Sequence, residues 1–209
     1  MITPRPYLSY SQYNAFHYSK ERFLKQYYYG EQQDSVYLDL GKRLGDALRF
    51  RYKREHKTIR DIRKQIPVAP TYEHEVRAVF KNIPLLCYLD GFFPHEFEIH
   101  EYKTGKKPSI KSWSAQMLFY SVAMYIKYKK LPNKITLYWC ETQFNENDQL
   151  VLTGKVKAYN IKIDIKQMLM FTEQITKTWE GIKKLCEDEY NKFGVLPVNR
   201  SANGRNKKQ

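Results

Sequence analysis

Residues 85–105 constrain the fold more than any other part of the chain, because they predict two neighbouring β-strands with charged side chains at matching places. The first strand ends at Asp90-Gly91, and the second carries Glu101 and Lys103. Residues two apart in a strand point to the same face, so Glu101 and Lys103 share a face. A hairpin between the two strands would bring Asp90 next to this pair.

Two carboxylates and a lysine gathered at a sheet form a site for a hard cation with an ammonium group beside it. That combination suits metal-assisted cleavage of a phosphodiester. The tripeptide carboxylate-x-Lys is weak evidence by itself, because the chain contains it at residues 55–57, 101–103 and 164–166. The first is predicted at a helix end and the third at a helix start, where the period of two does not hold. The middle copy is the one predicted in a strand.

The charge balance favours a polyanionic partner. The chain has 209 residues, and 36 Lys and Arg against 22 Asp and Glu give a net charge of +14. Such an excess suits a nucleic acid or an anionic membrane surface. Eighteen tyrosines accompany the charge, and their rings could stack on unpaired bases or pack at the boundary of the core. No predicted helix joins a clean apolar face to a basic one, which makes a membrane-surface protein the weaker alternative.

The cysteines predict neither a metal cluster nor a disulfide scaffold. Cys87, Cys140 and Cys186 lie far apart in the sequence and no CxxC pair exists, so a zinc or iron–sulfur centre has no obvious ligand set. The sparse, odd count favours a reducing compartment. The first residues lack the apolar segment of a secretory signal, and we expect a cytoplasmic protein without a membrane span.

Hydrophobic periodicity predicts the order of the elements. Three helices are expected first, then three strands, a helix, a hairpin and a long last helix capped by Asp164. The expected helices are 11–28, 38–56, 58–65, 111–129 and 164–193, and the expected strands are 73–80, 85–92, 97–102, 134–143 and 150–159.

This order predicts an α/β fold with a mixed central β-sheet flanked by helices. We expect one domain over residues 1–198, because no linker or internal repeat interrupts the pattern. Residues 199–209 are polar and basic, which predicts a disordered tail.

These motifs together resemble the PD-(D/E)XK nuclease superfamily and, within it, the RecB-like branch. The matching residues are Asp90-Gly91, the stretch 101–105, and Gln116 with Tyr120, which resemble the branch's Q-x-x-x-Y motif. Residues 8–16 and the aromatic residues that follow them are similar to the branch's N-terminal helix. The likeness in element order covers residues 7–195.

The resemblance implies a restriction-endonuclease-like core and roles for the matching residues. Asp90 and Glu101 would bind Mg²⁺ or Mn²⁺ with the backbone carbonyl of Tyr102. Lys103 would orient the attacking water and stabilise the charge of the transition state. Gln116 and Tyr120 lie one turn apart on a helix and would position the lysine or the DNA backbone; Glu73 or Glu75 would add an outer carboxylate.

The chain departs from the branch at two places. The branch often has a Gly-x-x-x-His motif whose histidine binds the metal, and aligning Gly41 with its glycine places Gly45 where the histidine belongs. The neighbouring Asp46 is a candidate substitute ligand. The four iron–sulfur cysteines of the branch members in CRISPR adaptation are also missing, so no cluster is expected.

The leading hypothesis is a metal-dependent DNA nuclease, an exonuclease or flap-type enzyme on DNA ends or single strands in recombination, repair or replication. The alternative is a nucleic-acid-binding protein on the same fold that has lost catalysis. A helicase or recombinase is a candidate partner, and a bacterial or viral origin is expected. Candidate contacts to nucleic acid are Tyr10, Tyr13, Arg43, Arg49, Lys106 and Lys107.

Overall fold

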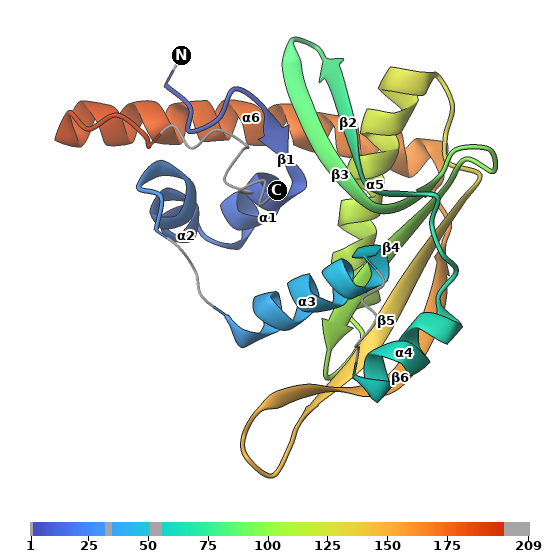
Figure 1. Ribbon diagram of the computed structural model, residues 1–209. Helices are drawn as coiled ribbons and strands as arrows, with labels where there is room; N and C mark the ends of the chain where they lie inside the picture. Colours follow the sequence, from blue (N-terminus) through green and yellow to red (C-terminus); the bar gives the residue numbers. More distant parts are fainter. Residues whose placement is uncertain (1, 32–34, 51–55, 199–209) are drawn as a thin grey trace.

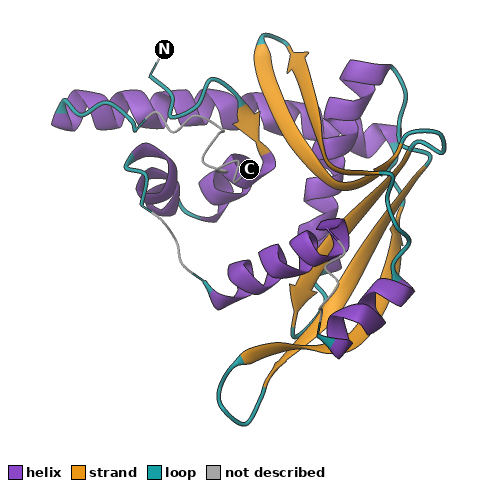
Figure 2. Ribbon diagram, in the orientation of Figure 1, coloured by secondary structure: helices purple, strands orange, loops and turns teal. Residues whose placement is uncertain are grey.

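The computed structural model of the chain has a mixed six-stranded sheet with helices on both faces (Figures 1 and 2). It describes residues 2–31, 35–50 and 56–198. The predicted α/β class is therefore confirmed. The prediction of a tail over residues 199–209 lies outside the described residues.

Neighbouring strands of the sheet pair in both directions: three pairs are antiparallel and two are parallel. β2 (Thr71–Phe80) and β3 (Ile83–Phe93) form an antiparallel hairpin, and β4 (Glu98–Gly105) is antiparallel to β3. β5 (Lys134–Phe144) is parallel to β4, and β6 (Leu150–Ile161) returns antiparallel to β5 and forms the edge of the sheet. The short β1 (Leu8–Ser9) is parallel to β3.

The two edges of β3 are used differently, and this difference creates the opening for the site. β2 pairs along β3 from Ile83 to Phe92, so it occupies one edge almost completely. β1 and β4 must then share the other edge. β1 pairs with β3 at Leu85 and Leu86, and β4 pairs with it only from Gly91 onward. Between these two contacts the edge of β3 carries no strand partner among the described residues.

The helices cover the sheet in two layers. α5 (Ile110–Tyr128) packs on β2 and β3, and α6 (Ile165–Phe193) packs on α5 and on α1 (Tyr10–Tyr18). α3 (Val36–Phe50) packs on β4 and β6, and α4 (Lys57–Gln65) packs on β6. The remaining helical segments are α2 (Lys20–Phe23) and the π-helical turn η1 (Leu24–Tyr28).

Each layer has its own apolar core. On the α5 side, residues such as Met117 and Phe119 of α5 pack with Leu89 and Ile99 of the strands, and all four are almost fully buried. On the other side, α3 and α4 bury a smaller cluster of Leu44, Leu48, Ile62, Ile66, Tyr138 and Cys140. Burying apolar side chains on both faces stabilises a sheet whose strands are mostly apolar.

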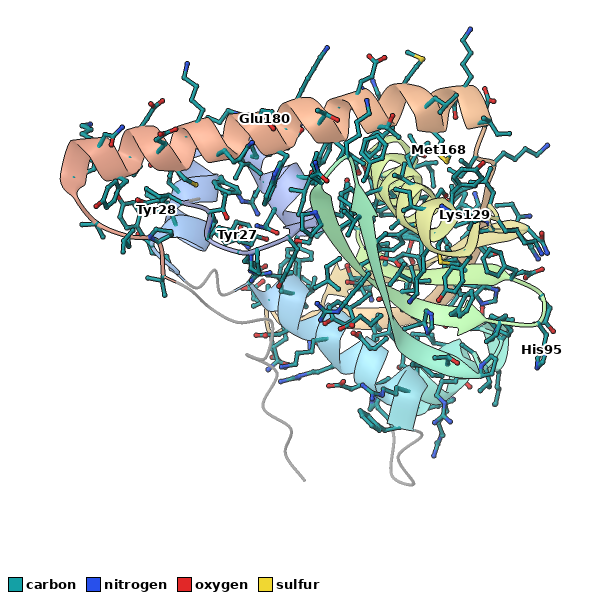
Figure 3. The ribbon with its side chains drawn as sticks, turned by 90° about the horizontal axis from the view of Figure 1, so that it is seen from above. Tyr27, Tyr28, His95, Lys129, Met168 and Glu180 are labelled. Atoms are coloured by element: carbon teal, nitrogen blue, oxygen red, sulfur yellow. The ribbon has the colours of Figure 1, made fainter. Side chains whose placement is uncertain are left out.

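α6 ties the N-terminal helices to the rest of the molecule. Seen from above, it passes along η1 at one end and α5 at the other, with Met168 near α5 and Tyr28 beneath its far half (Figure 3). The hydroxyl of Tyr28 donates a hydrogen bond of 2.5 Å to the carbonyl of Val195, just after the helix. None of the described helices is long and apolar enough to cross a bilayer.

Two predicted elements differ from the structure. The helix expected over residues 11–28 is broken at Ser19, whose φ of −164° and ψ of 133° are extended. The Ser19 hydroxyl accepts a hydrogen bond from the N–H of Arg22 and so caps a new helix, which is a preference that serine shows at helix starts. The helix expected over residues 38–56 is described from Val36 to Phe50; residues 51–55 lie outside the described residues, and His56 caps the next helix, α4. β1 was not predicted.

Candidate active site

Asp90 lies where β3 and β4 separate. The paired residues of these strands run from Gly91 with His100 to Phe93 with Glu98, so Asp90 is the first residue beyond the last pair. Its Oδ2 accepts a hydrogen bond of 2.9 Å from the main-chain N–H of Tyr102. β3 continues past Asp90-Gly91 to Phe93, one residue beyond the end of the strand expected over residues 85–92. The Asp90 carboxylate therefore accepts a hydrogen bond from a main-chain amide of β4 at the point where the two strands separate.

Gly91 is required by close packing. A Cβ atom at this position would lie 2.7 Å from the hydroxyl of Tyr102 and 3.1 Å from the Cβ of Ala69. Any side chain would push the Tyr102 ring away, because contacts below about 3 Å are repulsive. The glycine thus lets the aromatic ring of β4 cross β3 next to Asp90.

Glu101 is the centre of a hydrogen-bond network between β4 and α5. It is 1% exposed, and its Oε1 accepts 2.7 Å bonds from the Nζ of Lys103 and from the Nε2 of Gln116. The same amide nitrogen donates to the hydroxyl of Tyr120 at 2.6 Å. Because Gln116 and Tyr120 are one helical turn apart, both reach the same side of α5. The structure therefore brings together four of the five residues that the sequence singled out for catalysis.

Electrostatic interactions link Asp90 to this network. Burial and, next, the negative charge of Glu101 raise the pKa of Asp90 to about 8, against the opposing effect of Lys103. Burial lowers the pKa of Lys103, but the charges of Glu101 and Asp90 outweigh it, so this pKa ends above its usual value. Burial raises the pKa of Tyr120 well above its usual value, helped by the same two carboxylates. Asp90, Glu101 and Lys103 thus interact as one charged group.

The residues present fit a divalent cation. The Oε2 atom of Glu101 is buried and has no hydrogen-bond partner among the described residues, which is costly for a carboxylate oxygen. The negative charge of Glu101 also destabilises the charged form of Asp90. A hard cation between the two carboxylates would satisfy both, and Mg²⁺ is commonly held by one or two carboxylates, with water and substrate phosphate completing its shell.

No third side-chain ligand joins them: among the described residues, no three His, Cys, Asp or Glu side chains cluster as a metal site. The charges that shift the pKa of Asp90 are those of Glu101, Lys103 and Glu73, and Asp46 is not among them. Glu75 is held elsewhere, by a 3.1 Å bond to Arg77 and a 2.8 Å bond to Tyr88. A Cβ atom at Gly45 would meet nothing within 4 Å, so the position of the missing histidine is open space.

The expected nucleic-acid contacts fall into two groups. Tyr10 borders the site, because the charges of Lys103 and Glu101 both act on its pKa, which burial raises. Tyr13 is 7% exposed and donates to Gln174 across a 2.8 Å bond to α6. This burial argues against the stacking role expected for Tyr13. The basic residues expected to contact nucleic acid are exposed: Arg43, Arg49, Lys106 and Lys107.

The N–H of Tyr102 was missed by the sequence analysis, although it fixes Asp90. The resemblance pointed to the carbonyl of this residue, and no local pattern signals which main-chain amide a carboxylate will find across a sheet. The signal that could have found it is the break in strand pairing, which is a tertiary feature.

Comparison with known proteins identifies the fold and not the family. No protein family matches the chain in sequence, and no curated protein matches it significantly. Among solved structures, an exonuclease candidate from Eubacterium rectale has a TM-score of 0.59 at 10% identity, covering 88% of this chain and 82% of that one.

Two further structures share the fold. A phage-related exonuclease from Haemophilus somnus 129PT has a TM-score of 0.50 at 11% identity, covering 87% of this chain and 82% of that one. The alkaline exonuclease LHK-Exo from Laribacter hongkongensis has a TM-score of 0.51 at 12% identity, covering 90% and 94%. Identities this low establish a shared fold alone.

Proposed function

We propose that this chain is a Mg²⁺- or Mn²⁺-dependent nuclease of the PD-(D/E)XK superfamily, in its RecB-like branch, that hydrolyses phosphodiester bonds of DNA. One observation carries the proposal: Glu101 is fixed by Lys103 and Gln116 through one oxygen, while its second oxygen is buried, unpartnered and electrostatically linked to Asp90. The shared fold with three proteins described as exonucleases supports it.

The proposal assigns the carboxylates and the lysine different roles. Asp90 and Glu101 hold the cation, together with the main-chain carbonyl of Tyr102. When bound, the cation lowers the pKa of a water molecule and neutralises phosphate charge. The Lys103 ammonium, held 2.7 Å from Glu101, orients the attacking water and stabilises the negative charge that grows on the phosphate.

Gln116 and Tyr120 act one step further out. Gln116 donates to Glu101 and to Tyr120 through the same amide nitrogen, so it holds the carboxylate in one orientation. Rigid support of this kind matters because a metal ligand must stay within a few tenths of an ångström of its productive position. We therefore assign both α5 residues a positioning role.

For the substrate we propose DNA ends or single strands, cleaved from the end, in recombination, repair or replication. The net charge of +14 favours a polyanion, and the exonuclease fold favours attack from an end. A helicase or recombinase partner, one domain over residues 1–198 and a cytoplasmic location in a bacterium or an infected host belong to the same proposal.

Digestion of three DNA substrates with Mn²⁺ tests this function. Linear labelled DNA should be shortened progressively, whereas end-blocked and circular DNA should remain intact; equal digestion of circles would show internal cutting. Lys103→Ala and Glu101→Gln should each lose most of the activity. Lys177→Ala, an exposed lysine on α6, serves as the matched control. No cleavage by the wild type, or full cleavage by Lys103→Ala, would reject the proposal.

A specific observation favours the second candidate, a nucleic-acid-binding protein without catalysis. Gly45 leaves open space where the branch often has a metal-binding histidine, and Asp46 does not act on Asp90. Calorimetric titration of Mn²⁺ separates the two: a degenerate site should show no binding that depends on Asp90 and Glu101. Metal binding that Asp90→Asn removes would contradict this reading.

A further inference from the structure

The edge strand β6 packs against the α3 and α4 side at two residues, and its opposite face is open between residues 155 and 159. Its even-numbered side chains Leu152 and Val156 pack against the apolar cluster under α3 and α4. Because side chains alternate along a strand, the odd-numbered residues point to the opposite side. There Lys155 and Lys157 are exposed and Tyr159 is partly exposed. The core under α5 reaches this face of β6 at Ile161, so we call residues 155–159 its open face.

This open face is in register with the candidate active site. Lys103 of β4 pairs with Trp139 of β5, and Trp139 pairs with Lys157 of β6. Residues paired across strands lie on the same face, and neighbouring strands are about 4.8 Å apart. The Cα of Lys157 is therefore about 10 Å from that of Lys103 along one row of the sheet, a separation from two strand spacings.

Trp139 lies between Lys103 and Lys157 in this row and forms its fixed floor. It is 4% exposed, and its indole N–H donates a 3.1 Å bond to the carbonyl of Gly105, at the end of β4. The ammonium of Lys155 lies 5.8 Å from the centre of the Trp139 ring. Trp139 is thus a buried, fixed base beneath this row, and the groups open to a ligand are the lysines and Tyr159.

The two lysines of β6 differ in how far they are neutralised. Lys155 forms a 3.0 Å ion pair with Glu141, whereas Lys157 has no carboxylate partner among the described residues. Lys157 instead lies 5.2 Å from the centre of the Tyr159 ring. A free ammonium beside a partly exposed aromatic ring matches the two groups of a single-stranded nucleic acid, its phosphate and its unpaired base.

We propose that the open face of β6, with Lys157 and Tyr159 on the Trp139 floor, is the track on which a single strand of nucleic acid lies beside the active site. The proposal rests on the proposed function for the identity of the ligand, but it makes a statement about binding alone. A simpler reading is that the lysines only protect an exposed sheet edge from pairing with other chains. That reading predicts no effect on nucleic-acid binding.

Fluorescence anisotropy with labelled oligo-dT, in the presence of EDTA so that nothing is cleaved, tests the track. Lys157→Ala should weaken binding about fivefold and lower the slope of log affinity against log salt by about 0.7, the amount for one lost phosphate contact with a single strand. Lys157→Arg should bind like the wild type, because it keeps the charge. Lys155→Ala should have a smaller effect, because its charge is already paired.

The control is Lys177→Ala, an exposed lysine in the middle part of α6, which runs along the top of Figure 1, whereas β6 runs down to the hairpin at the bottom. Tyr159→Ala should weaken binding of oligo-dT while leaving binding of a blunt duplex unchanged, and Tyr159→Phe should bind like the wild type. Equal affinities of Lys157→Ala and Lys177→Ala would overturn the track. So would a wild type that binds the duplex but not oligo-dT.

The two proposals fail in different ways. A wild type that cleaves DNA with Mn²⁺, combined with an unchanged Lys157→Ala, rejects the track and leaves the nuclease standing. A wild type that never cleaves, combined with weaker binding by Lys157→Ala, rejects the nuclease and leaves the track as part of a binding protein.

Discussion

The main-chain N–H of Tyr102 donates a 2.9 Å hydrogen bond to the Oδ2 of Asp90. This bond joins the two strands just where their regular pairing stops at Gly91 and His100. It orients a carboxylate that would otherwise be free at a gap in the sheet. The position of Asp90 thus depends on how β4 packs, and β4 packs there through the ring of Tyr102.

Replacing Gly91 by alanine tests that dependence. The new Cβ would lie 2.7 Å from the Tyr102 hydroxyl, so the ring must shift, and we expect the strain to loosen the Tyr102 N–H that holds Asp90. We expect a loss of about 1–3 kcal/mol in the free energy of unfolding, as for other overpacked sites, and a large loss of nuclease activity. Urea denaturation and the Mn²⁺ cleavage assay measure the two effects.

Two further variants show whether the clash is the cause. Tyr102→Phe removes the hydroxyl and should restore part of the stability in the Gly91→Ala background. Gly45→Ala is the matched control, because its Cβ would meet nothing within 4 Å and alanine is favoured over glycine in a helix by up to about 1 kcal/mol. Equal destabilisation by both alanine substitutions would show that packing at Tyr102 is not the reason.

The second prediction concerns Gln116 and Tyr120. Gln116→Ala removes a hydrogen bond to the buried carboxylate of Glu101, so we expect kcat to fall strongly while KM for DNA changes little. Tyr120→Phe removes only the outer bond and leaves Gln116 donating to Glu101, so its effect on kcat should be smaller. Steady-state kinetics with Mn²⁺ measures the order of the two effects. A larger loss for Tyr120→Phe would contradict the proposed chain of support.

The sequence predicted most of the fold because its local signals are strong. The strands 85–92 and 134–143 and the helix 111–129 match β3, β5 and α5 closely. Asp164 caps α6 as expected, since its Oδ1 accepts a 3.0 Å bond from the N–H of Lys166. The break at Ser19 was missed because helical periodicity continues across it, and the two-residue β1 is too short to have a period.

The candidate site was predictable only in part. Glu101 and Lys103 share a face through the strand period, and Gln116 and Tyr120 share one through the helix period, so both pairs could be read locally. Their meeting across β4 and α5 came from the resemblance to a known family. The sequence left the burial of Tyr13 open, because an aromatic residue at helical spacing can pack in a core or stack on bases with the same pattern.

The third prediction is a pH dependence of metal binding. Burial and the charge of Glu101 raise the pKa of Asp90 to about 8, so in the absence of metal this carboxyl group is mostly protonated at pH 7. A metal ion must displace that proton. Affinity for Mn²⁺ should therefore rise about tenfold for each pH unit below 8 and level off above it.

Calorimetry in buffers of different ionisation enthalpy measures the released proton directly. The wild type at pH 7 should release close to one proton for each Mn²⁺ bound, and Asp90→Asn should release none. Without metal, the raised pKa also means that the folded state holds a proton that the unfolded state loses above its ordinary pKa of 3.8. Stability from this group should then fall as the pH rises from about 4 to 8. Metal binding that is independent of pH would show that Asp90 is already ionised.

The last prediction separates stability from catalysis at the buried ion pair. The side chain of Glu101 is 2% exposed and that of Lys103 is 25% exposed. Lys103→Met therefore leaves a buried carboxylate without its counter-charge. Breaking such a pair on one side typically costs about 3–5 kcal/mol, and the expected loss in the free energy of unfolding is near the lower end because Gln116 still donates to Glu101. The double variant Glu101→Gln with Lys103→Met removes both charges and should recover most of that stability. It should remain inactive, because it has neither the metal ligand nor the ammonium group. Recovery of cleavage together with stability would mean that this pair only supports the fold, and that the chemistry takes place elsewhere in the molecule.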